Sequence, residues 1–178
     1  MAYTHITSIA GLNPIANTDA GQTTANSATV VPSFPMKPGM IVQASDPTYG
    51  MGEFILLQGV ASTAIGDLVT YNSTTFQSVR AAVGTNIPFP IAVAMSANLA
   101  ATWGWYQISG VAVVNKSTGA TVGLVATNAA IGVVSVGLYG ATAASSEIQG
   151  AFNNASVTSA ATTGQITLNR PHLQGRIT

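Results

Sequence analysis

The scarcity of charged side chains constrains this chain more than any other feature of its sequence. Five basic and five acidic residues are spread over 178 positions, and the thirty residues between Lys116 and Glu147 contain none. Ordinary soluble domains carry about 25% charged residues, so this surface must be built from Thr, Ser, Asn, Gln and backbone. Because little electrostatic repulsion keeps monomers apart, we expect neighbouring chains to cover much of it.

The same composition argues against several classes of function. The net charge is zero and the basic residues are scattered, so no basic patch is available to neutralise the phosphates of a nucleic acid. The absence of cysteine excludes disulfides, thiolate metal sites and a cysteine nucleophile. Glycine and polar residues interrupt the uncharged stretch, which leaves no run of about 18 apolar residues, so we expect no membrane partner.

The chain divides into three parts by its pattern. Residues 1–35 are rich in Thr, Asn, Ala and Ser, are punctuated by Gly and Pro, and show no apolar period, which predicts an extended N-terminal arm. Such an arm is either disordered or laid along a neighbouring chain, although apolar residues three apart, from Ile6 to Ile15, also permit a short helix. Residues 36–150 form the predicted core, and residues 151–178 a C-terminal strand and contact tail. The N-terminus has no basic or continuous apolar region typical of a secretory signal, so we expect assembly in the cytoplasm where the chain is made.

From Pro38 onward, short runs rich in β-branched and aromatic residues alternate with turn residues. This pattern predicts an all-β fold, a small β-barrel or β-sandwich. Gly59 and Gly110, each followed by Val-Ala, are expected in mid-strand, where glycine marks a bulge or the close approach of another backbone. The segment 94–102 has room for one helical turn. The expected strands are Met40–Gln43, Glu53–Val60, Asp67–Tyr71, Phe76–Val79, Ile91–Met95, Trp105–Val114, Val122–Val125, Gly132–Val136 and Gln165–Asn169.

The residues needed for catalysis or metal binding are sparse. The two histidines, His5 and His172, lie near the chain ends, whereas catalytic groups need a rigid scaffold. Asp46, Glu53 and Asp67 are the carboxylates available in the core for glycoside hydrolysis, and turn formation explains Asp46 and Asp67 without a substrate. Zinc ligands are missing and no glycine-rich nucleotide loop occurs. We therefore expect no enzyme, no cofactor and no metal site, and leave open a calcium site built from backbone carbonyls.

Trp103, Trp105 and Tyr106 form the one group of large aromatic side chains that lie close together in the sequence. Alternation in a strand places both tryptophans on one face and Tyr106 on the other. We expect one tryptophan in the core and leave open whether the other lies at an interface. The remaining interface candidates lie in the arm, at its end and in the tail, and are Ile6, Ile9, Phe34, Met36, Arg170, His172 and Arg176.

Three elements carry a resemblance to a known family. These are Gly66-Asp67-Leu68-Val69, Ile91-Ala92-Val93-Ala94 and the strand from Gly104 to Ala112. With the intervening sequence, about residues 37–140, they resemble the small decoration or cement proteins of tailed bacteriophage heads. The resemblance implies a β-barrel or β-tulip-like module, often a homotrimer, that binds the outside of the capsid at junctions between major capsid subunits. It implies no catalytic residues.

The expected function is therefore that of a virion structural protein that stabilises a phage head. Its partners would be the major capsid protein and further copies of itself. Two alternatives belong to other classes. One is a carbohydrate-binding β-module of a phage fibre or cell surface that stacks sugars on Trp103 or Trp105. The other is a glycan-cleaving enzyme that uses Asp46, Glu53 or Asp67.

Overall fold

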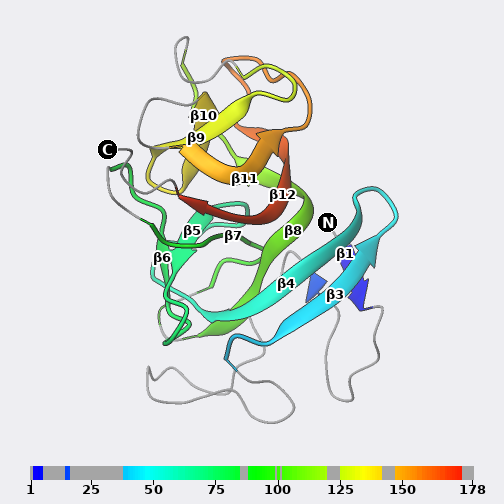
Figure 1. Ribbon diagram of the computed structural model, residues 1–178, viewed down its shortest axis with the longest axis vertical. Coiled ribbons are helices and arrows are strands. Elements are labelled where there is room, and N and C mark those ends of the chain that lie inside the picture. Colours follow the sequence, from blue (N-terminus) through cyan, green and yellow to red (C-terminus); the bar gives the residue numbers. More distant parts are fainter. Residues whose placement is uncertain are drawn as a thin grey trace.

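The chain folds into one antiparallel sheet that curls into part of a barrel, as the computed structural model shows (Figure 1). The structure describes residues 2–5, 15–16, 38–84, 88–98, 100, 102–119, 125–141 and 147–173. Twelve strands and no helix occur in these ranges. The predicted all-β fold is confirmed.

The strands follow one another along most of the sheet as antiparallel neighbours, in the order β10-β9-β11-β12-β8-β4-β3-β1-β2. The short strand β5 lies off this path, between β6 and β7, and β7 returns to β8. The bounds are β1 Ala2–His5, β2 Ile15–Ala16, β3 Ile41–Asp46, β4 Gly50–Gln58, β5 Leu68–Tyr71, β6 Ser78–Arg80, β7 Ile91–Ala94, β8 Trp103–Asn115, β9 Ala130–Ser135, β10 Leu138–Ala141, β11 Glu147–Asn153 and β12 Thr163–Leu173.

The long strand β8 organises the molecule. Its first half pairs with β4 along one edge, up to the pair Glu53↔Ser109. Its second half, from Ser109, pairs with β12 along the other edge. Gln107 is paired with Phe54 of β4 and with Val93 of β7. Since a strand has two edges, β7 and β12 share the edge opposite β4, and the sheet divides there.

Gly110 lies where β8 leaves β4. It has a positive φ of 90°, and a Cβ at this position would collide with the carbonyl oxygen of Met51. The pairing of β4 with β8 shifts register between Glu53 and Phe54. Of the two features predicted for Gly110, the close approach of another backbone is confirmed, and the bulge lies nearby at Ile108, which the register shift leaves between the paired residues Gln107 and Ser109. The mid-strand placement of Gly59 is wrong, because this glycine follows the end of β4 and its N–H donates to the carbonyl of Thr102 at 2.6 Å.

The apolar core lies in three clusters. Along β4, Phe54 and Leu56 pack into a cluster that contains both tryptophans, whereas Ile55 and Leu57 pack on the opposite face with residues of β5, β7 and β8. The third cluster lies inside the curl formed by the second half of β8 with β9, β10, β11 and β12, and residues of β5 and β7 also contribute to it. The structure thus has a central strand, β4, that is buried on both faces over residues 54–58, and an upper part that encloses a single core.

Most of the expected strands are present, with bounds that differ by a few residues. The strands β10 and β11 were missed by the sequence analysis, since β11 carries Glu, Gln and Gly among its apolar residues. Of the expected strand Val122–Val125, only Val125 lies in the described residues, where it forms an isolated bridge with Val157. The described part of 94–102 contains bends and a turn but no helix.

The described part of the N-terminal arm adds to the sheet of its own chain. In β1, Thr4 and His5 pair with Ser45 and Ala44 of β3, and β2 pairs with β1. The Tyr3 side chain is buried in the core. The expectation of an arm that is disordered or laid on a neighbour is therefore wrong for residues 2–5 and 15–16, because these residues find their hydrogen-bond partners within the chain. The other arm residues lie outside the described ranges.

Candidate interaction surfaces

Both tryptophans lie inside the chain. Trp103 and Trp105 are 5% and 1% exposed and share a cluster, while Tyr106 packs on the other face of the sheet. The predicted alternation is confirmed. The expectation of a tryptophan in the core is confirmed for both rings, which the cluster on that face, including Tyr3 and Phe54, buries. An interface or sugar platform, which was left open for the second tryptophan, finds no exposed ring here.

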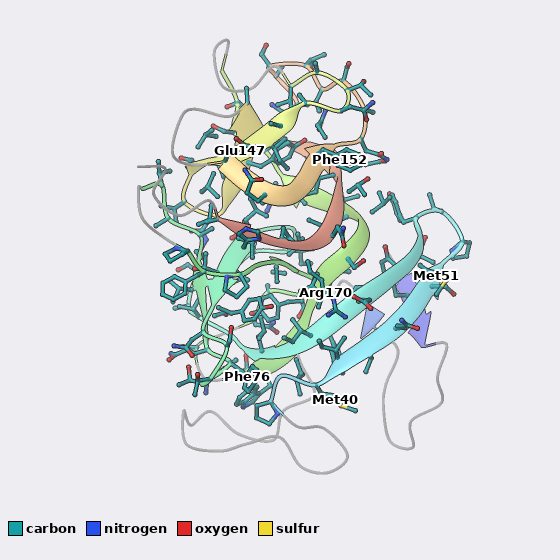
Figure 2. All side chains as sticks on the ribbon, in the orientation of Figure 1. Met40, Met51, Phe76, Glu147, Phe152 and Arg170 are labelled. Atoms are coloured by element: carbon teal, nitrogen blue, oxygen red, sulfur yellow. The ribbon has the colours of Figure 1, made fainter. Side chains whose placement is uncertain are left out.

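The C-terminal candidates have local partners. The Arg170 guanidinium forms a forked ion pair with Glu53, at 3.0 Å from Nε and 3.3 Å from the second nitrogen, and lies where β12 passes β4 (Figure 2). This hydrogen bond lowers the pKa of the Glu53 carboxyl. His172 is exposed and its backbone pairs with Gln149 and bridges to Pro90. The candidates Ile6, Ile9, Phe34, Met36 and Arg176 lie outside the described residues.

The candidate carboxylates hold local structure together. Asp46 Oδ1 accepts hydrogen bonds from the backbone N–H groups of Thr48 and Tyr49, at 2.7 and 3.0 Å. This is the turn-forming role predicted for Asp46. Glu53 pairs with Arg170, as described above. Each of these groups therefore has a structural partner that competes with any catalytic role.

Asp67 and the preceding glycine form a junction between distant strands. The buried Asp67 carboxylate lies 2.8 Å from Arg80 Nε and accepts a 2.8 Å hydrogen bond from the Asn115 side chain. Gly66 donates to Ala94 O and accepts from Asn115 N, both at 2.8 Å. Leu68 N donates to Gly137 O in the β9–β10 turn at 2.8 Å. The Gly-Asp element that carried the family resemblance thus ties β5 to β7, β8 and the β9–β10 turn.

The Tyr3 side chain packs at the point where β8 bends, a role that the sequence analysis did not predict. Its hydroxyl donates to Val111 O at 2.9 Å, and its ring packs edge-on against Phe54 with centroids 4.7 Å apart. The Gln107 amide donates to the carbonyls of Ser109 and Val111, at 3.0 and 2.9 Å. These donors satisfy carbonyl groups at the point where β8 no longer pairs with β4. Burial raises the pKa of Tyr3 to about 12.

One exposed surface with apolar side chains follows β3 and the β3–β4 hairpin, and we call Ile41, Gln43 and Met51 the edge surface. Ile41 and Met51 are 44% and 61% exposed, and Met51 lies near the tip of the β3–β4 hairpin (Figure 2). Within the described ranges, β1 covers the outer edge of β3 at Ala44 and Ser45, and no strand covers it at residues 41–43.

A second exposed apolar surface surrounds a pocket of about 260 Å³ beside β5 and β6, which we call the β5–β6 pocket. Phe89 and Val79 are its most exposed apolar residues, at 47% and 56%. The pocket is lined by Thr70, Tyr71, Asn72, Thr75, Gln77, Val79 and Phe89, none of which carries a charge.

Few charges reach the surface of the described part of the chain. Asp46, Asp67 and Lys116 are buried, Arg80 pairs with Asp67, and Glu53 pairs with Arg170. The described residues hold no group of three or more His, Asp or Glu side chains placed to bind a metal. They also hold no helix of the length and apolarity required to cross a bilayer.

No protein-family model, curated protein or solved structure matches this chain.

Proposed function

We propose that this protein is a capsid decoration protein that binds the outer surface of a phage head at junctions between major capsid subunits. The observation that carries the proposal is the edge surface, where exposed apolar side chains lie beside a stretch of β3, residues 41–43, that no described strand covers, and where the nearby charges of the described residues are paired. The sequence resemblance to decoration proteins and the scarcity of charge support the same role.

A strand edge that no described residue covers suits binding to a shell protein. A strand or arm of the capsid that adds to β3 at residues 41–43 gains backbone hydrogen bonds, and Ile41 and Met51 supply apolar contacts beside it. Neither contribution needs charged side chains. Individually weak contacts suffice, because copies joined to one another bind a repeating lattice with an avidity far above that of a single contact.

The proposal includes the assembled form and excludes catalysis. The decorating unit is a homotrimer in the virion, assembled in the host cytoplasm, and it needs no cofactor. The alternative function of a carbohydrate-binding module based on Trp103 or Trp105 loses its support, because both rings are buried. The glycan-cleaving alternative loses support because Asp46, Glu53 and Asp67 each serve a local structural contact.

The test is co-expression with the major capsid protein encoded in the same genome, followed by gradient sedimentation of the particles. The wild-type chain should sediment with the particles. Ile41→Lys places a charge on the edge surface and should reduce occupancy at least tenfold, whereas Val136→Lys, at an exposed apolar residue of the β9–β10 turn, should leave it unchanged.

Each outcome addresses a different part of the proposal. A wild-type chain that stays at the top of the gradient would remove the decoration function. Equal occupancy for wild type and Ile41→Lys would leave the function standing but exclude the edge surface as its site.

A further inference from the structure

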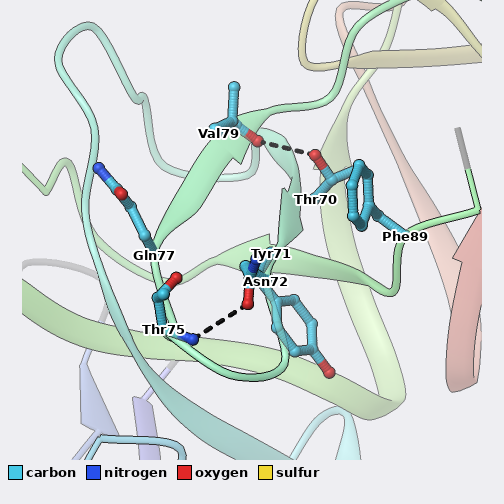
Figure 3. A pocket seen from close by; sticks show the side chains of 7 residues that line it. All are labelled: Thr70, Tyr71, Asn72, Thr75, Gln77, Val79 and Phe89. Carbon is cyan, nitrogen blue, oxygen red and sulfur yellow. Dashed lines mark hydrogen bonds between the residues drawn. The ribbon is translucent and has the colours of Figure 1, made fainter.

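The β5–β6 pocket combines aromatic rings with neutral hydrogen-bonding side chains (Figure 3). Its volume of about 260 Å³ is slightly below the range of about 300–1,000 Å³ typical of small-molecule pockets, which suits a ligand of one or two rings. We propose that this pocket binds an uncharged saccharide. The inference does not depend on the capsid function proposed above.

Two aromatic side chains provide the apolar part of the site. Phe89 is 47% exposed although it is a large apolar residue, and Tyr71 lies half-buried beside it in the pocket. The C–H faces of a sugar ring stack on such rings, which removes apolar surface from water without requiring charge. Burial also raises the pKa of the Tyr71 hydroxyl, so this group remains a neutral donor.

The polar side chains of the pocket sit on a turn that is already ordered. Asn72 Oδ1 accepts hydrogen bonds from the N–H groups of Thr74 and Thr75, at 2.7 and 3.0 Å, and this fixes the amide while leaving its nitrogen as a donor (Figure 3). The exposed Gln77 side chain adds a second amide from the end of the same turn. Ordering of these groups before binding reduces the entropy lost when a ligand is held.

Backbone hydrogen bonding distinguishes a saccharide from a peptide at this site. The N–H of Tyr71 donates to Pro90 O at 3.2 Å, that of Asn72 to Gln77 O at 3.1 Å, and that of Phe76 to Asn72 O at 2.8 Å. A peptide that added as a strand would need open backbone groups there, whereas sugar hydroxyls pair with side-chain amides and hydroxyls. The absence of a cation in the lining argues against phosphorylated or acidic sugars.

The pocket and the edge surface are separate but approach each other at one end. In Figure 1, β5 and β6 lie on the left, and β3 lies with β1 on the right. The start of β3 nevertheless lies near the turn at 72–77, because a Cβ on Gly39 would touch the Phe76 ring.

The test is saturation-transfer NMR of the purified chain with a panel of neutral probes at millimolar concentration: glucose, galactose, mannose, N-acetylglucosamine and their disaccharides. At least one probe should bind the wild-type chain, and Phe89→Ala should weaken that binding at least tenfold. Phe152→Ala is the matched control, because it removes a phenylalanine of similar exposure, 41% against 47%, from β11.

Three results would overturn the inference. One is the absence of binding by every probe. Another is binding that Phe89→Ala leaves unchanged while thermal unfolding shows both variants to be folded. The third is stronger binding of N-acetylneuraminic acid, an acidic sugar, or of an unstructured peptide than of any neutral probe.

Discussion

The lower and upper parts of the sheet bury their apolar side chains in different ways. The lower part consists of β3, β4 and the first half of β8, and the five consecutive residues from Phe54 to Gln58 are all buried. The upper part consists of the second half of β8 with β9 to β12, and along β12 buried residues such as Ile166 and Leu168 alternate with exposed or half-buried ones. The second half of β4 is thus covered on both faces, whereas the upper part encloses a core on its inner face.

The comparison shows how one long strand serves both arrangements. β8 contributes to all three apolar clusters, and its path changes at Gly110, where Tyr3 and Gln107 satisfy the carbonyls that β4 leaves. The bend lets the upper half curl inward without breaking the strand. Substitutions on either side of this point therefore test how far the two parts depend on each other.

Gly110→Ala should have the largest effect. The left-handed φ of 90° and the collision of the new Cβ with Met51 O should together lower the free energy of unfolding by about 3–5 kcal/mol. Gly50→Ala is the matched control, because its φ is 74° but no atom lies within 4 Å of the new Cβ, so about 1 kcal/mol is expected. Urea unfolding measures both. Equal losses would show that the close approach at the bend is unimportant.

Tyr3→Ala should destabilise the chain by about 3 kcal/mol, because it removes a buried aromatic ring from the lower part. Tyr3→Phe keeps the ring and removes one of the two donors to Val111 O, the other being the Gln107 amide, and should cost about 1 kcal/mol. The same unfolding measurement applies to both. If Tyr3→Ala unfolds at the wild-type midpoint, β1 is not part of the lower core.

Asp67→Asn should cost about 2 kcal/mol. It removes the buried charge that faces Arg80, and the partial exposure of Arg80 keeps the loss below the roughly 3–5 kcal/mol expected for a fully buried pair. Arg170→Ala breaks the exposed pair with Glu53 instead and should leave the thermal midpoint unchanged. A larger effect of Arg170→Ala would mean that the contact between β12 and β4 at the surface, rather than the Asp67 junction, holds the parts together.

Alkaline pH probes one tyrosine in each part. Burial raises the pKa of Tyr3 and of Tyr139 to about 12, above the unfolded value near 10. Between these values the folded chain holds protons that the unfolded chain releases, so stability falls as pH rises from 10 toward 12. Each tyrosine should contribute a loss of about 1.4 kcal/mol at pH 11. Tyr3→Phe and Tyr139→Phe should each reduce the slope of unfolding free energy against pH. An unchanged slope in either variant would place that hydroxyl in contact with water.

Much of the fold could be predicted from local sequence. Runs of β-branched and aromatic residues between turn residues indicated the strands, and Gly110 indicated the bend. The strand β11 could not be recognised, because its pairing with β9 and β12 depends on residues distant in sequence. The burial of both tryptophans could not be predicted either, since alternation along a strand assigns a side chain to a face but does not say whether that face is covered.

The candidate surfaces were harder to predict from the sequence. The β5–β6 pocket joins the turn at 72–77 with Phe89, and no local pattern connects these segments. Asp67 was correctly assigned to a turn, but its ion pair with Arg80 requires β5 and β6 to pair.

The all-β class and the lack of charge follow from the amino-acid sequence without further information, because strand preference and composition are properties of short segments and of residue counts. The burial of Tyr3 in the core of its own chain and the burial of β4 on both faces depend on the three-dimensional fold. The fold also decides which apolar side chains remain exposed. Those features depend on contacts between residues far apart in the chain, and local pattern carries no information about such contacts.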